Sequence, residues 1–420
     1  MTPPQQHNDA SRNEPSRATS DAQGDVQHGA QPPPGTIPPM QQHAEEKLRG
    51  GRLRRSLRVV RRRKKFAAGL SLVLTFYLVA VLADFLAPYD YRAQSRREPF
   101  APPSVIRFRD AEGQTSLRPF VYARRLVDPL QRRYVEDTAR AYPLAFFTRG
   151  YTYKLFGIIT TDRHLFGVRT GASETTATGV DGRNAVGAAS DVTRVHLFGT
   201  DALGRDRLSR LLVASRFSLV VGPLGTLLAC ALGVFLGCLA GYMGRMADAL
   251  LMRVADTMLA LPTLVVILAA RAAFPLELPP MRAAALLITI FTLVGWAEMA
   301  RVARGLVLGL RRREFVSAAV SLGLSQTRVL FRHILPNAAR PLLVQATLML
   351  PAFLLAEISL SFLGVGLQEP EPSWGNMLAA ASDITLLQRG NATVLLLPAF
   401  AIILFVLGVR LTSDGLKETR

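Results

Sequence analysis

The chain has 420 residues, of which 49% are hydrophobic, and a formal net charge of +19. Soluble domains are also about 45–50% apolar, so the class of protein must be read from where the apolar residues lie. Cys230 and Cys238 lie eight residues apart in one apolar run, too far along a helix to form a disulfide. The six histidines show no metal-ligand spacing, and neither HExxH nor CxxC occurs, which argues against a metal site.

The N-terminal 65 residues predict a disordered, basic, cytoplasmic tail. Residues 1–45 are rich in Gln, Pro, Ser and Asn and lack aliphatic periodicity. Residues 47–65 hold eleven Lys and Arg and no acid. Such a run is also compatible with nucleic acid or anionic lipid. Because it directly precedes an apolar run, we prefer a role in setting membrane topology and predict no nucleic-acid partner.

Six apolar runs are each long enough to cross a hydrocarbon layer of about 30 Å as a helix. The first, 66–88, is too long and too far from the N-terminus for a secretory signal, so we interpret it as a retained anchor helix. The other five lie near 217–243, 250–273, 283–300, 341–364 and 392–411. The sequence therefore predicts an all-α membrane protein, with a five-helix core over 211–412 and a short cytoplasmic C-terminus at 413–420.

Residues 89–210 predict a soluble, mixed loop region between the first two transmembrane helices. Residues 104–123 favour two short strands around a turn at Asp110–Gly113. The aromatic-rich stretch 142–168 is expected to supply the core of this region, and the Gly, Ala, Ser and Thr residues of 169–192 a flexible linker.

The charges of the short loops predict the orientation. Residues 301–340 hold eight arginines and one glutamate, whereas the loops 274–282 and 365–391 carry one arginine each. Basic short loops stay in the cytoplasm. We therefore expect both termini and the 301–340 loop to be cytoplasmic, and residues 89–210 to be extracytoplasmic.

The second apolar run carries small residues at every fourth position, which places them on one helix face. Such a face allows two helix backbones to approach closely. The spacing leaves open whether it packs within its own subunit or against another chain. The residues are Gly225, Ala229, Gly233, Gly237 and Gly241.

Residues 314–336 predict a bent pair of short amphipathic helices. Gly323 suits the left-handed conformation that ends a helix, Ser325 can cap the next one, and Pro336 is expected to stop it. A short amphipathic helix can lie among lipid headgroups, against its own bundle or in a groove of another protein. The small alanine side chains argue against the headgroups and suit close packing in a fitted groove. The apolar stripe of the first helix consists of Phe315, Ala318, Ala319 and Leu322.

Three motifs in this order resemble the membrane permease subunits of bacterial ABC importers, and more narrowly the single-anchor-helix type of the dipeptide/oligopeptide/nickel branch. The resemblance covers 66–88 and 195–420 and leaves out the tail and much of 89–194. It implies the type I ABC importer permease fold. The motifs are "HLFGTDALGRDRLSRLLVASRFSL" (196–219), "EFVSAAVSLGLSQTRVLFRHILPN" (314–337) and "AEISLSFLGVGLQEPEPSWGNML" (356–378).

The resemblance implies that 314–336 is the EAA loop, whose coupling helix docks into a cytoplasmic ATPase subunit. Ser317 stands where the family usually has glutamate. Either Glu314 or the arginines at 311–313 would then supply the polar contacts. The positions that match the family motif are Glu314, Ala318, Ala319, Gly323, Ile334, Leu335 and Pro336.

Glu357 is an acidic residue inside the fifth apolar run and matches an acidic position of the family. It would either line the pathway and meet the amino group of a peptide, or form a hydrogen bond between helices. Asp201 and Asp206 precede the second run, where each suits a helix cap or a contact with a binding protein.

The chain has no GxxxxGK[ST] phosphate loop, so ATP and Mg would bind to separate subunits and this chain would hold no cofactor. The resemblance implies a non-catalytic subunit of the bacterial inner membrane, forming half of the pathway for peptides or similar small solutes. Its implied partners are a second homologous permease, two cytoplasmic ABC ATPases, an extracytoplasmic solute-binding protein and the surrounding lipid. The alternatives are a secondary transporter, whose repeated halves and discontinuous helices we do not find, and a membrane-anchored sensor.

Overall fold

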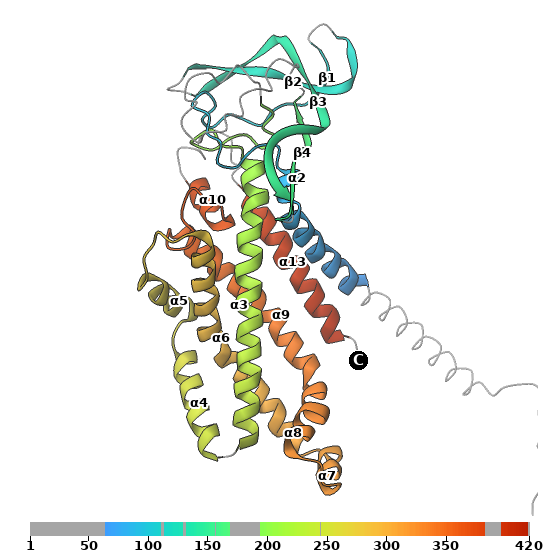
Figure 1. Cartoon of the computed structure of the whole chain (residues 1–420), viewed down its shortest axis with the longest axis vertical. Coiled ribbons are helices and arrows are strands. Elements are labelled where there is room, and N and C mark those ends of the chain that lie inside the picture. Colours follow the sequence, from blue (N-terminus) through green and yellow to red (C-terminus); the bar gives the residue numbers. More distant parts are fainter. Residues whose placement is uncertain are drawn as a thin grey trace, which may run out of the picture. The chain divides into compact units, whose positions relative to one another are not determined.

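A computed structural model describes residues 64–110, 113–128, 132–155, 157–168, 194–243, 245–382 and 396–418. The tail up to residue 63 and the linker 169–192, for which the sequence predicts disorder and flexibility, lie outside these residues. The described part is a bundle of helices with an antiparallel sheet at one end, and α7 (Glu314–Ser321) at the other (Figure 1). We refer to these as the sheet end and the α7 end.

Among the described residues, five helices are long and apolar enough to cross a membrane, which confirms a multi-pass helical protein. The first is followed by the short helix α2 (Ala83–Leu86). The predicted helical membrane fold with six spans is confirmed in part, and the sheet that follows α2 lies in the region predicted to be mixed. The five are Lys64–Val81, α3 (Arg207–Met243), α6 (Pro280–Arg311), a continuous run over Gln326–Phe362 that ends in α9 (Leu335–Phe362), and α13 (Leu397–Glu418).

The third predicted span, 250–273, is wrong as a single helix. The chain instead forms α4 (Arg245–Ala260) and α5 (Thr263–Ala272), which are bent by 89° relative to each other. Pro262 lies at the break, where its missing N–H and its ring prevent a continuous helix. The number of candidate spans in the described residues therefore reaches six only if this bent pair counts as one span.

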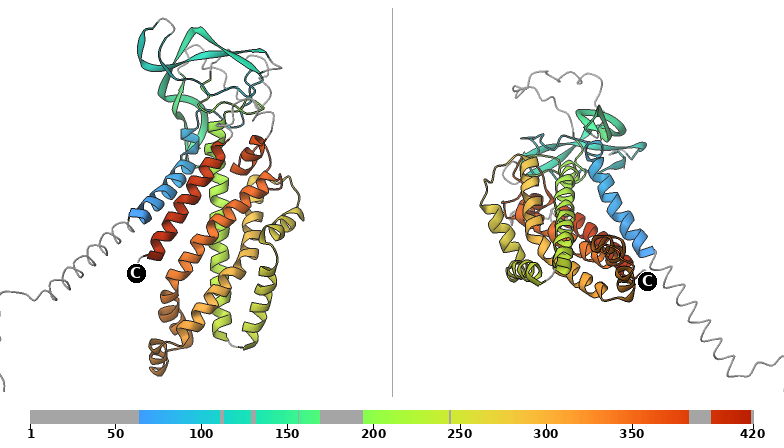
Figure 2. Two further views of the ribbon diagram at one scale, coloured as in Figure 1. Left: turned by 180° about the vertical axis from the view of Figure 1, so that it is seen from behind. Right: turned by 60° about the horizontal axis from the view of Figure 1, so that its bottom comes forward.

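The sheet has four antiparallel strands in chain order. Two strands flank the predicted turn, where Asp110 accepts a hydrogen bond from the backbone N–H of Gln114. The first of the two predicted short strands is confirmed, because β1 has three residues, but the second is longer than predicted, because β2 has 14. Register shifts within all three strand pairs bend the sheet, which curls visibly in Figure 2. The strands are β1 (Arg107–Arg109), β2 (Thr115–Asp128), β3 (Arg133–Leu155) and β4 (Ile159–Val168).

Hydrogen bonds attach the sheet to the segment that precedes it and to α2. The Tyr134 hydroxyl donates to the Pro99 carbonyl at 2.7 Å. The imidazole of His164 lies 3.0 Å from the Asp84 carbonyl of α2 and is buried against Tyr153. The aromatic stretch 142–168 thus contributes buried residues as predicted, although Phe146 and other rings in it remain exposed.

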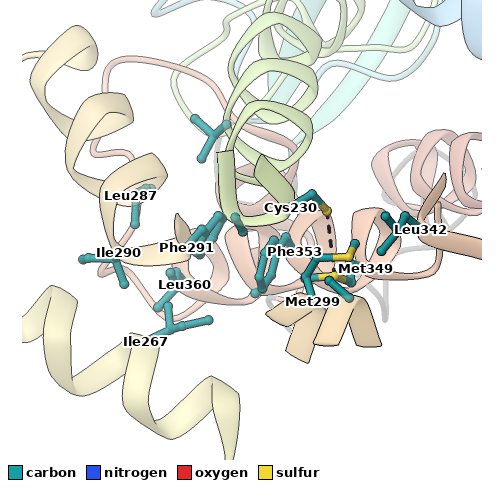
Figure 3. Packing of buried hydrophobic residues seen from close by; sticks show 14 of the residues in the cluster. Cys230, Ile267, Leu287, Ile290, Phe291, Met299, Leu342, Met349, Phe353 and Leu360 are labelled. Atoms are coloured by element: carbon teal, nitrogen blue, oxygen red, sulfur yellow. Dashed lines mark hydrogen bonds between the residues drawn. The ribbon is translucent and has the colours of Figure 1, made fainter. Parts of the chain in front are cut away.

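The small-residue face of α3 packs against α6 of the same chain, which settles the alternative that the spacing left open. A Cβ added at Gly233 would lie 2.6 Å from the Trp296 carbonyl oxygen, and one at Gly241 would lie 2.9 Å from Val307. The core beside this contact includes the stacked rings of Phe291 and Phe353, 5.1 Å apart (Figure 3). Close backbone approach therefore builds the interior of this subunit.

The predicted anchor helix is packed into the bundle along α13. A Cβ at Gly415 would lie 2.5 Å from Phe66, and one at Gly69 would lie 2.5 Å from the Thr412 backbone nitrogen. At the sheet end, Arg216 of α3 pairs with Asp84 of α2 at 2.8 Å. The anchor is thus packed against α13 near its start and tied to α3 through α2 at the sheet end.

Candidate functional site

The α7 end carries the predicted pair of short helices. Gly323 has φ +76°, which confirms the predicted left-handed residue after the first helix. Its N–H donates to the Val320 carbonyl at 2.9 Å, and the N–H of Leu324 donates to the Ala319 carbonyl at 3.3 Å. These two bonds form a Schellman motif, which satisfies the last carbonyls of α7 and reverses the chain. Ser325 occupies the cap position of the next helix but makes no side-chain capping bond.

The predicted apolar stripe of α7 does not face the bundle. Val316 and Ala319 are buried beside Val307 and Ile334, and they anchor α7 to the rest of the chain. Of the predicted stripe, only Ala319 is among them. The outward side carries exposed apolar groups, and Leu322 is 82% exposed. We call this outward set the α7 surface: Phe315, Ala318, Val320, Leu322 and Phe331.

The prediction that Pro336 stops the second helix is wrong. The chain continues from α8 (Gln326–Val329) through the π-helical turn η1 (Leu330–Ile334) into α9, and Pro336 lies in the first turn of α9. A π turn is wider than an α turn and is a known site of irregular helix geometry. η1 ends two residues before Pro336, whose missing N–H cannot make the regular α-helical bond to the carbonyl four residues earlier.

The structure divides the seven motif positions between two environments. Ala319 and Ile334 are buried and Leu335 is half-buried, so these three hold the helix pair in place. The remaining positions, Glu314, Ala318, Gly323 and Pro336, are exposed, as are Ser317 and the arginines at 311–313. Both proposed sources of polar contacts are therefore available on the outside, and the choice between them stays open.

Glu357 lies inside the chain. Its side chain is 0% exposed, and its Oε1 accepts a hydrogen bond from Ser361 Oγ at 2.9 Å. Its Oε2 has no partner among the described residues, and the buried hydroxyl of Ser218 on α3 is likewise unpaired there. Complete burial favours the structural alternative for this residue over a position on the pathway wall.

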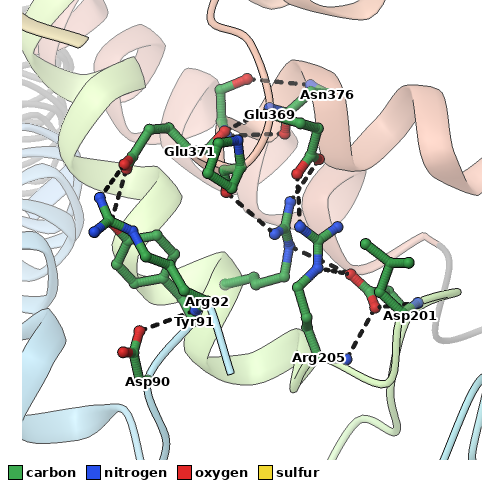
Figure 4. A network of polar contacts seen from close by, with 12 residues as sticks. Asp90, Tyr91, Arg92, Asp201, Arg205, Glu369, Glu371 and Asn376 are labelled. Atoms are coloured by element: carbon green, nitrogen blue, oxygen red, sulfur yellow. Dashed lines mark hydrogen bonds and ion pairs between the residues drawn. The ribbon is translucent and has the colours of Figure 1, made fainter. Parts of the chain in front are cut away.

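Ion pairs at the sheet end connect α3 to the loop after α9, an arrangement that the sequence did not predict (Figure 4). Glu369 accepts from Arg205 and from Arg210, each at 2.7 Å. The Asp201 carboxylate lies 2.6 Å from Nε of Arg205 and accepts a hydrogen bond from the backbone N–H of Arg205 at 2.9 Å. Glu371 pairs with Arg92 and accepts from the Tyr91 hydroxyl. These contacts join three segments that are far apart in the sequence.

A buried histidine lies between two carboxylates at the N-terminus of α3. His196 Nδ1 is 2.8 Å from Asp206, and its Nε2 is 3.4 Å from Glu98. Burial disfavours the charged imidazole, but the hydrogen bonds and charges of Asp206 and Glu98 outweigh it and raise the pKa of His196 to about 9. Asp206 also accepts from the backbone N–H of Ser209 at 2.8 Å, so it caps α3 as one of the two alternatives predicted.

The described residues form a bundle of helices, several of them long and apolar enough to cross a membrane, with an exposed helical hairpin at one end. Residues 233–418 match the family model described as "binding-protein-dependent transport system inner membrane component". Residues 51–103 match the N-terminal TM domain of oligopeptide transport permease C. The chain belongs to this family of inner-membrane transport components and is a non-catalytic subunit. This membership excludes the secondary transporter and the membrane-anchored sensor.

Three similar proteins show the kind of permease that this chain resembles. The dipeptide transport system permease protein DppC of Alkalihalophilus pseudofirmus is 39% identical over 223 residues, which are 53% of this chain and 70% of that protein. The oligopeptide transport system permease protein OppC of Bacillus subtilis is 35% identical over 235 residues (56% and 74%). OppC of Haemophilus influenzae is 33% identical over 238 residues (56% and 73%).

Proposed function

We propose that this permease imports peptides in an ATP-driven complex, with both termini and the α7 end in the cytoplasm and the sheet end outside it. Three relatives named as dipeptide or oligopeptide permeases support the substrate class. The arginine-rich segment 301–340, which includes α7, supports the orientation. A second homologous permease would complete the pathway, and an extracytoplasmic solute-binding protein would deliver the peptide.

The observation that carries this proposal is the α7 surface. It consists of exposed apolar side chains on α7, on its C-cap Leu322 and on η1, and buried residues of the same helix pair anchor it. An apolar surface held in a fixed position, with arginines and Glu314 beside it, suits the groove of another folded protein. The partner that fits in the cytoplasm is the ATPase subunit.

The helical connections suggest how movement of this surface would reach the other end of the molecule. α8, η1 and α9 form one continuous run, Gln326–Phe362. The loop that follows it carries Glu369, which is paired with Arg205 and Arg210 of the α3 end. In the proposed cycle the two ATPases close on ATP, displace α7 and α8 and turn the pathway outward, and hydrolysis resets it. The ATPases act by binding one conformation of the permease better than the other.

The proposed function is tested with the complete importer, assembled from this chain and the ATPases, second permease and solute-binding protein of its genomic neighbourhood. Vesicles containing the complex should accumulate peptide only with ATP inside and the solute-binding protein outside. If the wild-type complex hydrolyses ATP but accumulates no peptide, the peptide assignment is wrong.

The coupling role of α7 is tested at Gly323. Gly323→Pro removes the N–H that bonds Val320 and imposes a negative φ where the structure has +76°. This variant should insert normally but lose co-purification with the ATPases. Gly323→Asn is the matched control, because asparagine tolerates the left-handed conformation and should retain the ATPases. Undiminished association of the proline variant would contradict the docking role.

A further inference from the structure

The anchor helix carries an exposed apolar stripe that runs towards the sheet end. Leu74, Leu78 and Val81 follow the spacing i, i+4, i+7, which places them on one face of the helix. They are 57%, 59% and 46% exposed and lie within the span Lys64–Val81. Exposed aliphatic side chains at this depth match the acyl chains of a bilayer.

The stripe continues beyond the span. The backbone N–H of Leu82 donates to the Leu78 carbonyl and that of Leu86 donates to the Leu82 carbonyl, each at 2.9 Å, so the helix runs on from the span into α2. Phe85 therefore follows Val81 by one helical turn on the same face. It lies about 6 Å further along the axis, within the interfacial layer of about 5–8 Å that separates hydrocarbon from water on each side of a bilayer.

The β3–β4 hairpin extends the stripe at this level. Phe147 of β3 packs on Phe85 with the ring centroids 6.3 Å apart. β4 lies beside α2 as well, where the imidazole of His164 is 3.0 Å from the Asp84 carbonyl (Figure 1). Phe147 nevertheless remains 58% exposed, and Phe146 before it is 73% exposed. Two adjacent exposed phenylalanines at the end of a membrane span form an apolar patch that favours a covering partner.

Two arginines follow these phenylalanines in the hairpin. Arg149 comes two residues after the pair and is the register partner of Arg163, and both side chains are exposed. Of the nearby acids, Asp162 lies 3.8 Å from Arg149, and Asp84 is already paired with Arg216. Bulky apolar rings beside long cationic side chains are typical of segments that lie at a membrane surface. We call Phe146, Phe147, Arg149 and Arg163 the hairpin patch.

We propose that the hairpin patch lies in the surface of the lipid bilayer beside the anchor helix, with its phenylalanines among the upper acyl chains and its arginines at the phosphate groups. The apolar stripe that leads to the patch argues for lipid as the occupant. The inference does not depend on peptide import or on the side that the sheet end faces, because both leaflets supply acyl chains and phosphates. It gives the sheet, which lies between the segments matched by the two family models, an attachment to the membrane.

The test measures the surroundings of position 146 in the complete importer in phospholipid nanodiscs. Phe146→Cys carries a bimane fluorophore, and Phe147 stays in place to keep the contact with Phe85. The matched control is Leu117→Cys with the same label, because Leu117 is 100% exposed on β2. The wild-type complex treated with the reagent is the blank, since Cys230 and Cys238 are buried.

Two quenchers distinguish lipid from water. Phospholipids brominated near the top of the acyl chain quench a fluorophore that touches them, whereas iodide quenches one that lies in water. Brominated lipid should quench the label at position 146 at least about threefold more than the label at position 117, because the patch lies in the interfacial layer. Iodide should show the reverse order.

A charge reversal tests the arginines. Arg163→Glu should lower the quenching of the label at position 146 by brominated lipid about twofold or more, because a carboxylate is repelled by the phosphate groups. Arg118→Glu is the matched control, since Arg118 is exposed on β2 and the charge changes by the same amount. This control should leave the quenching unchanged.

Three results would overturn the inference. Strong iodide quenching and weak quenching by brominated lipid at position 146, as at position 117, would place the patch in water. Protection from both quenchers would show that another protein, such as the second permease, covers it. Equal effects of Arg163→Glu and Arg118→Glu would refute the contact between the arginines and phosphate. Peptide import by the wild-type complex is measured separately, so each of these results leaves the proposed function intact.

Discussion

Truncating Leu322 to alanine measures the contribution of the α7 surface to ATPase docking. The side chain is 82% exposed in this chain, so docking can bury most of it. Fully burying a leucine side chain is worth about 1.5–3 kcal/mol, of which alanine retains the Cβ share. We expect the loss to be roughly 1–2 kcal/mol, which corresponds to roughly 5- to 30-fold weaker binding.

The assay is the dissociation constant between the permease pair in nanodiscs and the purified ATPase subunit. Thermal stability of the permease should be unchanged, because Leu322 buries little of itself within this chain. Leu117→Ala is the control, because this substitution makes the same change of side chain at the sheet end, where Leu117 is 100% exposed. If Leu322→Ala binds the ATPase as tightly as Leu117→Ala does, the α7 surface is not the contact.

Three further predictions concern the interior and the sheet end. Gly233→Ala should lower the free energy of unfolding in detergent by about 1–3 kcal/mol, because its Cβ would lie 2.6 Å from the Trp296 carbonyl oxygen. The control Gly305→Ala should leave that free energy unchanged, because its Cβ would meet no atom within 4 Å. Equal stability of the two variants would contradict the α3–α6 packing. The imidazolium of His196 should stabilise the fold by an amount on the order of 3 kcal/mol below about pH 6.5, the pKa of an unfolded histidine. This contribution should disappear as the pH rises through about 9, the pKa in the folded protein. If the melting temperature of His196→Gln changes with pH as much as that of the wild type, this prediction is wrong. Glu357→Gln should leave the KM for peptide within about twofold of wild type, because the side chain is buried and a glutamine oxygen can still accept the hydrogen bond from Ser361 Oγ. A large rise in KM would indicate that Glu357 lines the pathway.

The local features of the α7 end were predictable because neighbouring residues determine them. Gly323 can adopt φ +76° at low cost, and the apolar period of 314–322 defines a helix without reference to the rest of the chain. Which side of that helix would be buried was not predictable. Val316 packs inward because of the position of Val307 on α6, and only the tertiary structure provides that position.

Two prolines behave differently from the predictions that the sequence supports. The apolar run 250–273 predicts one helix, but the chain breaks at Pro262, because proline disfavours a helix interior. Pro336 predicts a helix end, whereas the helical run continues from η1 through this proline into α9. In both cases the result depends on the packing of the flanking helices, which decides whether the chain bends at a proline or continues past it.

The sequence by itself determined that the chain crosses a membrane several times, that a polar helix pair interrupts its apolar runs, and which side carries the positive charge. Each of these properties depends on the hydrophobicity or the charge of residues that are neighbours in the sequence, so the fold is not needed to predict it. Only the tertiary structure decided the partners: the glycine face of α3 against α6, and Glu369 between Arg205 and Arg210, about 160 residues away. Such contacts form between segments that the whole bundle brings together, so no spacing within one segment encodes them.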